Sequence, residues 1–254
     1  MDAAGSVFDS LFALAVLAFI LIVGTSSIRN FLRTEGAPEA GGGSLVLGPG
    51  IRGWYVAHLQ PIEERCIQWG VTPAVLSYTQ LAASIVVGYL YARGWLFTGG
   101  WLLLTTGSLD IVDGRVARRT SGASKRGAFL DSVIDRYADS AAFIGLAIFF
   151  RDSWILWAAL LALLGGMMVS YTRARAEGLG AECKVGLLQR PERYVLLGFG
   201  TIFGVLFDHI AAPWFAPPPH LLVALAIVVL GLLVNFTAIQ RVVHVWRVLG
   251  EPDA

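Results

Sequence analysis

Four aspartates at helical spacing are the residues of this sequence best suited to chemistry. Asp110 and Asp113 are three residues apart and Asp131 and Asp135 are four apart, so each pair shares one face of a helix. If the two helices lie side by side and antiparallel, the four carboxylates converge on one point. Because such carboxylates repel one another unless a cation lies among them, the spacing predicts a site for Mg²⁺ or Mn²⁺, which favour oxygen ligands.

The composition places these acids in an integral membrane protein. Of 254 residues, 56% are hydrophobic and only 15% are charged, with a mean hydropathy of +0.67, whereas soluble domains have about 25% charged residues. The net charge of +1 gives no indication of nucleic acid as a partner. The two cysteines, Cys66 and Cys183, match no zinc or redox spacing, so we expect free thiols.

Apolar segments predict six transmembrane helices that position the aspartates. We expect the spans at these ranges, in chain order: 73–92, 95–109, 128–150, 154–172, 194–210 and 221–239. Asp110 then follows the second span directly, and Asp131 and Asp135 lie in the first turns of the third. The expected fold class is an all-α integral membrane protein, a six-transmembrane-helix bundle.

Two further segments precede this bundle. Residues 51–70 mix aromatic, charged and aliphatic side chains, which predicts an amphipathic interfacial helix interrupted near Pro61; a soluble connector is the alternative. No basic residue precedes the apolar run at 8–26, so we expect an extra transmembrane helix within 1–34 instead of a cleaved signal peptide. Residues 35–50 are rich in Gly, Pro and Ala and predict a linker, which leaves 51–250 as the main domain.

The basic residues orient the predicted bundle. Most Lys and Arg lie in the connections at 114–126 and 173–193 or in the segments before 74 and after 240. The turns at 93 and 151 hold one arginine each. Since basic connections stay on the cytoplasmic side of a membrane, the aspartates are expected to face the cytoplasm, in the cell (inner) membrane. Ordinary interfacial anchoring, or ion pairs with Arg115, Arg118 and Arg136, is the simpler interpretation of each aspartate taken singly.

The whole pattern around the aspartates resembles the signature of the CDP-alcohol phosphotransferases. That signature is D-x2-D-G-x2-A-R-x8-G-x3-D-x3-D, and this chain matches it at every fixed position, from Asp110 to Asp135. The resemblance covers residues 51 to about 245. It implies a six-helix bundle with a cytoplasm-facing polar cavity, usually a homodimer. It also implies a two-metal site and transfer of a phosphatidyl or related group from a CDP-linked donor to an alcohol, with release of CMP.

The same resemblance assigns roles to the aspartates. Asp110, Asp113 and Asp131 are the implied main metal ligands, with two ions able to hold a diphosphate and stabilise charge on its oxygens. Asp135 is the implied base that takes the proton of the acceptor hydroxyl while also touching a metal. A carboxylate is a weak base, so a nearby metal or burial must favour the alkoxide.

Residues around the aspartates are implied to contact the CDP donor. Gly114 lets the backbone approach the nucleotide, Ala117 leaves space on the same helix face, and Arg118 pairs with a donor phosphate. Gly127 permits close approach at the start of the third span; turn geometry and helix packing are the alternative for both glycines. Ser77 stands where many relatives carry Thr, although Ala74 departs from their Asn or Asp.

A second informative segment is the basic stretch from Arg173 to Arg193. Clustered arginines beside the metal site suit an acceptor that carries its own phosphate, although contact with anionic lipid headgroups is an alternative. The stretch resembles the corresponding loop of prokaryotic phosphatidylinositol-phosphate synthases, which use CDP-diacylglycerol and inositol phosphate, with Arg173 replacing a Lys. The acceptor-phosphate role is therefore carried to these residues, in decreasing order of expectation: Arg173 and Arg193, then Arg175 and Arg190, then Arg241.

The leading hypothesis is thus a Mg²⁺-dependent enzyme of phospholipid synthesis, with CDP-diacylglycerol as donor and inositol phosphate as acceptor. Glycerol 3-phosphate, inositol or another polar alcohol remain alternative acceptors for the same chemistry. A non-catalytic membrane protein, such as a small transporter or a scaffold, is the alternative of another class. The intact four-aspartate pattern argues against it, because a scaffold has no need of four clustered carboxylates.

Overall fold

The computed structural model describes residues 48–120, 124–183, 185–211, 214 and 219–250, and the regular structure of these residues is helical. The expected extra helix within 1–34 and most of the expected linker lie outside these residues. Seven helices follow one another along the described chain: α2 (Gly48–Gln68), α3 (Pro73–Ala92), α4 (Leu96–Arg119), α5 (Lys125–Phe149), α6 (Ile155–Gly178), α7 (Arg190–Ala211) and α8 (Leu221–Gly250).

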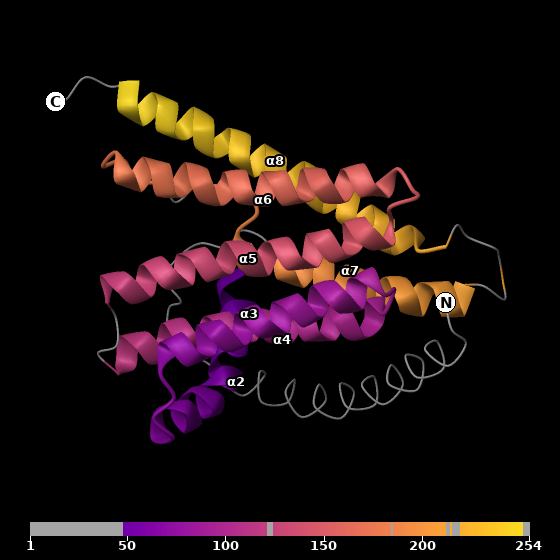
Figure 1. Ribbon diagram of the computed structural model, residues 1–254. Coiled ribbons are helices and arrows are strands. Elements are labelled where there is room, and N and C mark those ends of the chain that lie inside the picture. The colour runs from indigo at the N-terminus through magenta and orange to yellow at the C-terminus, as the bar shows by residue number, and fades with distance from the viewer. Residues whose placement is uncertain (1–47, 121–123, 184, 212–213, 215–218, 251–254) are drawn as a thin grey trace.

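Six of these helices form a closed ring. Going round it, α3 packs on α4, α4 on α7, α7 on α8, α8 on α6, α6 on α5, and α5 again on α3. Figure 1 shows the six helices side by side along one direction. The helices that carry the signature, α4 and α5, are therefore neighbours of α3 on opposite sides, and their aspartates meet across the interior of the ring.

The helix boundaries of the first half agree well with the sequence at α3 and less well at α4. The structure confirms a helix over Pro73–Ala92 and a turn at Gly94, whose φ of +80° favours glycine. The expected connection at 114–126 is wrong, because α4 continues through the aspartates to Arg119. α5 then begins at Lys125, where the Ser124 Oγ accepts a hydrogen bond from the Gly127 amide and caps the helix.

The expected polar loop at 173–193 is also shorter than predicted. α6 continues to Gly178, so Arg173 and Arg175 lie on its last turns, and α7 begins at Arg190. Charged residues do not end these helices, since their side chains can leave the apolar interior while the backbone continues its hydrogen bonds. The arginines expected on one flexible loop are therefore held by two helix ends.

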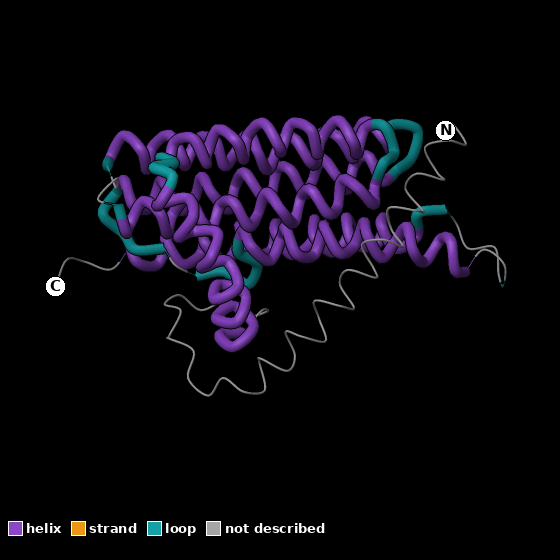
Figure 2. The backbone as a smooth tube through the Cα atoms, turned by 90° about the horizontal axis from the view of Figure 1, so that it is seen from below, coloured by secondary structure: helices purple, strands orange, loops and turns teal. Residues whose placement is uncertain are grey.

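The interfacial helix is continuous, in contrast to the interruption expected near Pro61. α2 runs from Gly48 to Gln68 with Pro61 inside it. Pro61 is exposed, so water can satisfy the carbonyl that a proline leaves without a partner. α2 packs against α4 and lies crosswise to the bundle (Figure 2).

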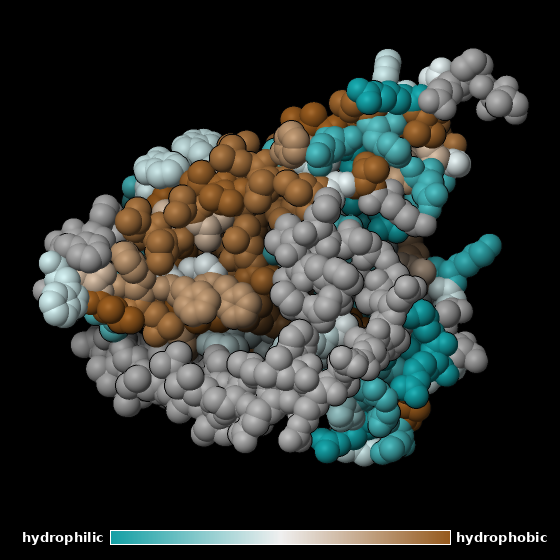
Figure 3. Space-filling view, turned by 180° about the vertical axis from the view of Figure 1, so that it is seen from behind, coloured by the Kyte–Doolittle hydropathy of each residue, from teal (hydrophilic) through white to brown (hydrophobic). Residues whose placement is uncertain are grey.

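The surface has an apolar band and a polar end. Four helices, α3, α6, α7 and α8, are long and apolar enough to cross a membrane by length and composition; α4 and α5, the other two expected spans, carry the charged signature residues. In Figure 3 hydrophobic residues cover most of the visible described surface, and hydrophilic residues gather at the end that holds α2 and the α4–α5 connection. The chain is thus a multi-pass membrane protein.

Close packing fixes α3 against α5. A Cβ added to Gly88 would lie 2.5 Å from the Ala141 carbonyl oxygen, and a Cβ added to Gly145 of α5 would lie even closer to the Gly88 carbonyl oxygen. This crossing sits beside the apolar core, where Tyr91 and Leu146 are inaccessible to solvent. Small residues therefore let two backbones touch, which sets the distance at which α3 and α5 present their polar ends.

Candidate metal and phosphate site

Three of the four signature aspartates come together as predicted. Asp110 and Asp113 of α4 and Asp131 of α5 each offer one carboxylate oxygen, and these oxygens all lie within 4.8 Å of one another. Asp113 is buried, and the other two are partly buried. Asp135 lies one turn after Asp131, and its Oδ1 is 2.6 Å from the Arg190 Nη1 that also contacts Asp110.

Neutral side chains of α3 orient the α4 carboxylates. The Ser77 hydroxyl donates to Asp113 Oδ2 at 3.2 Å, and the fully buried Gln80 donates through Nε2 to Asp110 Oδ1 at 3.4 Å. Ser77, expected to contact the CDP donor, therefore contacts a metal-ligand candidate in the structure. Hydrogen bonds of this kind fix the rotamers of ligating carboxylates.

One arginine lies among the acids. Arg190 Nη1 is 2.5 Å from Asp110 Oδ1 and 2.6 Å from Asp135 Oδ1, and Arg190 Nε donates to Asp139 Oδ1 at 3.0 Å. This arginine was expected in the acceptor site, but the structure places it against the carboxylate cluster. Arg115 is not the partner of these aspartates, because it pairs with Glu63 of α2.

Asp139 joins the carboxylate cluster to the arginines of α7. Its Oδ1 accepts from Arg190, and its Oδ2 lies 3.1 Å from Arg193 Nη1. The Arg193 side chain is only 5% exposed, and its buried Nε has no hydrogen-bond partner among the described residues. A buried donor without a partner is costly unless a ligand supplies an acceptor, so Arg193 points to an anion.

The remaining acceptor candidates divide into two groups. Arg241 is buried and donates to the carbonyl oxygens of Val185 and Val169, at 2.8 and 2.7 Å. Its electrostatic neighbours include Arg173, Arg193 and Glu177, so three of the predicted arginines share one region of the structure. Arg173 is half exposed and pairs with Glu177, and Arg175 is exposed at the end of α6.

The donor candidates lie around the ends of α4 and α5. Gly114 and Ala117 are partly buried on α4, and Arg118 is exposed. A Cβ added to Gly114 would lie 3.4 Å from Arg118 Nη1, an ordinary van der Waals contact, so Gly114 and the Arg118 guanidinium are neighbours. Gly127 is exposed in the first turn of α5, where its amide is used by the Ser124 cap.

The sequence did not predict the roles of four residues, three in this site and one, Glu63, on α2 outside the carboxylate cluster. Asp139 continues the Asp131–Asp135 stripe at the same four-residue spacing, a signal that could have found it. Gln80 and Tyr194 are polar residues in apolar spans, where such residues often have a function. Glu63 is the fourth; it is inaccessible to solvent and binds Arg115 and Arg119 of α4 at 2.6 and 3.0 Å.

The donor set fits divalent cations. Asp110, Asp113 and Asp131 supply hard oxygen ligands, and the buried Asp131 Oδ1 has no hydrogen-bond partner in the described structure. A buried carboxylate oxygen left without a donor is suited to a metal ion, and clustered carboxylates suit Mg²⁺ or Mn²⁺ better than softer metals. The cluster therefore supports the use of a divalent metal.

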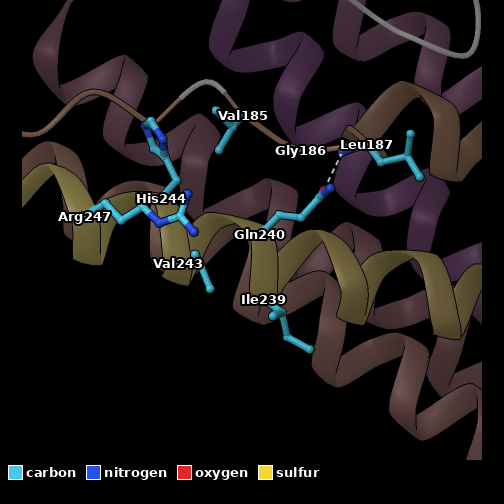
Figure 4. Close-up of a pocket in the computed structure, with 8 residues that line it drawn as sticks. All are labelled: Val185, Gly186, Leu187, Ile239, Gln240, Val243, His244 and Arg247. Atoms are coloured by element: carbon cyan, nitrogen blue, oxygen red, sulfur yellow. Dashed lines mark hydrogen bonds between the residues drawn. The ribbon is translucent and has the colours of Figure 1, made fainter.

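A separate groove of about 430 Å³ lies outside this cluster. Figure 4 shows it between the segment Val185–Leu187 and the last turns of α8, where His244 and Arg247 stand at one end and Gln240 bonds the Leu187 amide. The Val185 carbonyl of this segment accepts a hydrogen bond from Arg241. None of the predicted site residues lines the groove.

Comparisons with known proteins agree with this geometry. The sequence model described as CDP-alcohol phosphatidyltransferase matches residues 70–250. Archaetidylinositol phosphate synthase of Methanothermobacter thermautotrophicus is 43% identical over 157 residues, which are 62% of this chain and 74% of that protein. Phosphatidylinositol phosphate synthase of Streptomyces avermitilis is 36% identical over 225 residues, which are 84% of this chain and 87% of that protein.

Solved structures give the same result. The crystal structure of Mycobacterium tuberculosis phosphatidylinositol phosphate synthase with CDP-DAG bound has a TM-score of 0.64 and 29% identity, over 76% of this chain and 97% of that one. The same enzyme in complex with manganese and citrate has a TM-score of 0.64 and 28% identity, over 76% and 92% of the two chains. With its signature aspartates gathered in one cluster and its sequence matched over most of its length, this chain belongs to the CDP-alcohol phosphatidyltransferase family.

Proposed function

We propose that this enzyme transfers the phosphatidyl group of CDP-diacylglycerol to a hydroxyl of inositol phosphate. The products are phosphatidylinositol phosphate and CMP. The observation that carries the proposal is the junction at Asp139, where a carboxylate cluster meets a region of arginines across one shared side chain. Such an arrangement suits a reaction that joins a diphosphate donor to an acceptor that carries its own phosphate.

The bonds of the reaction are simple. The acceptor hydroxyl oxygen forms a bond to the lipid-side phosphorus of the donor, and the bond from that phosphorus to the bridging oxygen breaks, so CMP leaves. Asp135 is the proposed base for the hydroxyl proton, because it borders both the carboxylate cluster and Arg190. Arg118 is proposed to pair with the donor, with Gly114, Ala117 and Gly127 leaving room for it. Ser77 acts on the donor only through Asp113.

Asp110, Asp113 and Asp131 are proposed to hold Mg²⁺ or Mn²⁺, with Asp135 able to touch a second ion. When bound, two divalent cations neutralise the charge of a diphosphate and of the oxygens that gain charge in the transfer. The chain's own contribution is to hold those carboxylates in place through Ser77 and Gln80.

Arg193 and Arg241 are the first candidates to bind the acceptor phosphate. Both are buried, and they share one region of the structure with Arg173, so guanidinium groups are available there to pair with a phosphate dianion. Arg190 borders the same region through Asp139, and Arg175 lies at its exposed edge. The relatives support this acceptor, since both are named as synthases of an inositol phosphate lipid.

The proposed setting is the cell (inner) membrane, with the polar end of the bundle in the cytoplasm and a homodimer as the assembly. The basic residues of α4–α5 and α6–α7 support the orientation, because such residues stay on the cytoplasmic side. Soluble inositol phosphate and a membrane-held donor could then meet at the carboxylate cluster.

A second donor has support from one relative. The archaeal protein, 43% identical, is named for an archaetidyl product, which has the same headgroup on a different lipid. An archaeal CDP-lipid is therefore the second candidate for the donor. Equal amounts of the two CDP-lipids in one assay, with separation of the two lipid products, distinguish these donors directly.

The acceptor assignment is tested by substitution of Arg193. We expect Arg193→Gln to lower the ratio of kcat/KM for inositol phosphate to kcat/KM for inositol at least about tenfold, because a charged hydrogen bond to phosphate contributes about 1.5–3 kcal/mol. Arg151→Gln, at an exposed turn, is the control and should leave the ratio unchanged. An equal loss with both acceptors in Arg193→Gln would contradict a phosphate-binding role.

A further inference from the structure

We infer that Arg190 is an internal counter-ion of the carboxylate cluster. A divalent cation must displace Arg190 from Asp110 and Asp135, and the released guanidinium then binds an oxyanion of the acceptor. The inference rests on the proposed function and goes further, because it makes metal binding and acceptor binding dependent on each other. It concerns one side chain, and it follows from the different partners of that side chain's three nitrogen atoms.

The three nitrogen atoms of the Arg190 guanidinium have different partners. Its Nε donates to Asp139 at 3.0 Å and its Nη2 donates to the Tyr194 hydroxyl at 3.1 Å, and the guanidinium carbon lies 5.2 Å from the Tyr194 ring centre. Only Nη1 reaches the signature acids, at 2.5 Å from Asp110 and 2.6 Å from Asp135. Two bonds therefore hold the arginine at the edge of the cluster whatever Nη1 contacts.

Nη1 contacts a carboxylate group, that of Asp110, which the metal site also needs. Asp110 belongs to the group of three carboxylates that can hold a cation, and its Oδ1 is already used by Arg190. The arginine is 15% exposed at its side chain, so water screens its charge little. Two cations a few ångströms apart repel by about 4 kcal/mol per pair of unit charges at an effective dielectric constant of 20. Arg190 in this position therefore weakens metal binding.

Displacement need not expel Arg190 from the site. If the carboxylates of Asp110 and Asp135 turn from Nη1 toward a cation, the bonds from Nε to Asp139 and from Nη2 to Tyr194 can remain, because the rigid, planar guanidinium need not move. Asp139 is also the partner of Arg193, so the freed nitrogen stays next to the arginine that we propose for the acceptor phosphate. Metal binding then supplies the acceptor with a second guanidinium. Because coupling between two binding sites is reciprocal, an oxyanion must also strengthen metal binding.

The test is Mn²⁺ binding by the purified full-length protein, measured by calorimetry or by electron paramagnetic resonance of free Mn²⁺. We expect Arg190→Gln to bind Mn²⁺ at least about tenfold more tightly than wild type, since it removes the competing charge. Arg119→Gln is the matched control: it removes a guanidinium paired with Glu63 instead of the cluster, and should stay within about twofold of wild type. Unchanged or weaker Mn²⁺ binding by Arg190→Gln would overturn the inference.

A second arm tests the coupling with sulfate, a dianion that stands in for the acceptor phosphate. Sulfate should tighten Mn²⁺ binding by wild type several-fold, within the usual range of coupling energies, and should lose this effect in Arg190→Gln. No effect on wild type, or the same effect on the variant, would contradict the release of Arg190 toward an oxyanion.

Two further results keep the inference separate from the proposed function. If wild type and Asp113→Asn bind Mn²⁺ equally weakly, the proposed metal site is wrong. If Asp113→Asn loses Mn²⁺ binding while Arg190→Gln keeps the Mn²⁺ affinity of wild type, only the counter-ion role is wrong. Should Arg190→Gln not fold, a structure of Mn²⁺-loaded wild type decides the question. Arg190 Nη1 should then have left both Asp110 and Asp135, and its persistence on both would contradict the inference.

Discussion

Individual carboxylates in this site are held by neutral donors from α3 on one side and by arginines of α7 on the other. Ser77 contacts Asp113 and Gln80 contacts Asp110, while Arg190 contacts Asp110 and Asp135. Neutral hydrogen bonds fix a carboxylate without reducing its charge, so they leave it free to bind a cation. Ser77 and Gln80 therefore hold Asp113 and Asp110 in place and leave their charge available to a cation.

A prediction for Ser77 follows at this scale. Ser77→Ala should weaken Mg²⁺ or Mn²⁺ binding about tenfold, because groups that orient metal ligands typically contribute 10–100-fold to affinity. Ser77→Thr keeps the hydroxyl and should recover most of the loss. Ser84 offers a matched control, since it is a buried serine of the same helix whose hydroxyl has no hydrogen-bond partner in the described structure. Metal affinity reduced as much by Ser84→Ala would refute a specific role for Ser77.

At the residue scale, the sequence predicted which aspartates gather, but it did not predict which residues contact them. Asp110, Asp113 and Asp131 are spaced along single helices, so local periodicity was enough to predict that they gather. Arg190 lies 80 residues from Asp110 in sequence, and its contact with that acid depends on how α7 packs against α4. Such a contact has no local signal, which is why Arg190 was expected to bind phosphate alone.

Among the elements, α2 is fixed to the bundle by one buried acid. Glu63 accepts hydrogen bonds from Arg115 and Arg119, near the end of the helix that carries Asp110 and Asp113. Burial alone would raise the pKa of Glu63, but the two guanidinium groups lower that pKa below its ordinary value of 4.5. The carboxylate therefore stays ionised, and the pair links the interfacial helix to the metal-bearing helix.

This link predicts a pH-dependent stability difference. A lowered folded-state pKa gives stability that is present above 4.5 and is lost as the pH falls through the lowered pKa. At neutral pH, Glu63→Gln should therefore have a lower Tm than wild type, and the gap should narrow as the pH drops below 4.5. Glu64→Gln, at the exposed neighbouring residue, should show no such gap. A gap for Glu63→Gln that is constant with pH would rule out the proposed ion pair.

The α3–α5 crossing gives a second prediction for an element. Gly88→Ala would place a methyl group 2.5 Å from the Ala141 carbonyl oxygen, so the two helices must separate. We expect a destabilisation of about 1–3 kcal/mol, measured by denaturant unfolding in detergent. Gly178→Ala has no atom within 4 Å of the new methyl group and should be neutral or slightly stabilising. Equal stability of the two variants would show that the crossing tolerates separation.

The sequence predicted the bounds of a helix correctly where the apolar segment and the helix end at the same residues. α3 begins at Pro73 and ends before Gly94, and both residues mark helix ends in the sequence. α4 and α6 extend ten and six residues beyond the expected spans, to Arg119 and Gly178. Hydropathy reports only the part of a helix that meets lipid, so it cannot reveal a helix that continues into the polar end.

The whole molecule is a ring of helices with its chemistry at one end. Signature carboxylates, α7 arginines and α2 all lie at the polar end, while the apolar core around Tyr91 and Leu146 fills the remainder. This separation supports the proposed orientation, because the proposed acceptor is soluble and the proposed donor is held in the membrane. Arg93 and Arg151 then mark the opposite side.

Cysteine labelling tests that orientation. On a background with Cys66 and Cys183 replaced by serine, Arg151→Cys should react with a membrane-impermeant maleimide in intact cells. Lys125→Cys, at the start of α5, should react only after the membrane is permeabilised. The two positions lie at opposite ends of one helix, so each serves as the control for the other. The reverse pattern would place the carboxylate cluster outside the cytoplasm.

The most direct test of the central claim is product identification with a panel of acceptors. Purified protein with Mg²⁺ and labelled CDP-diacylglycerol is given inositol phosphate, inositol, glycerol 3-phosphate and serine separately, and the lipid products are analysed by mass spectrometry. We predict phosphatidylinositol phosphate with equimolar CMP from inositol phosphate alone, at a rate that Asp135→Asn lowers at least about a hundredfold, as expected for loss of a general base. A different lipid product, or CMP release that Asp135→Asn leaves intact, would contradict the account.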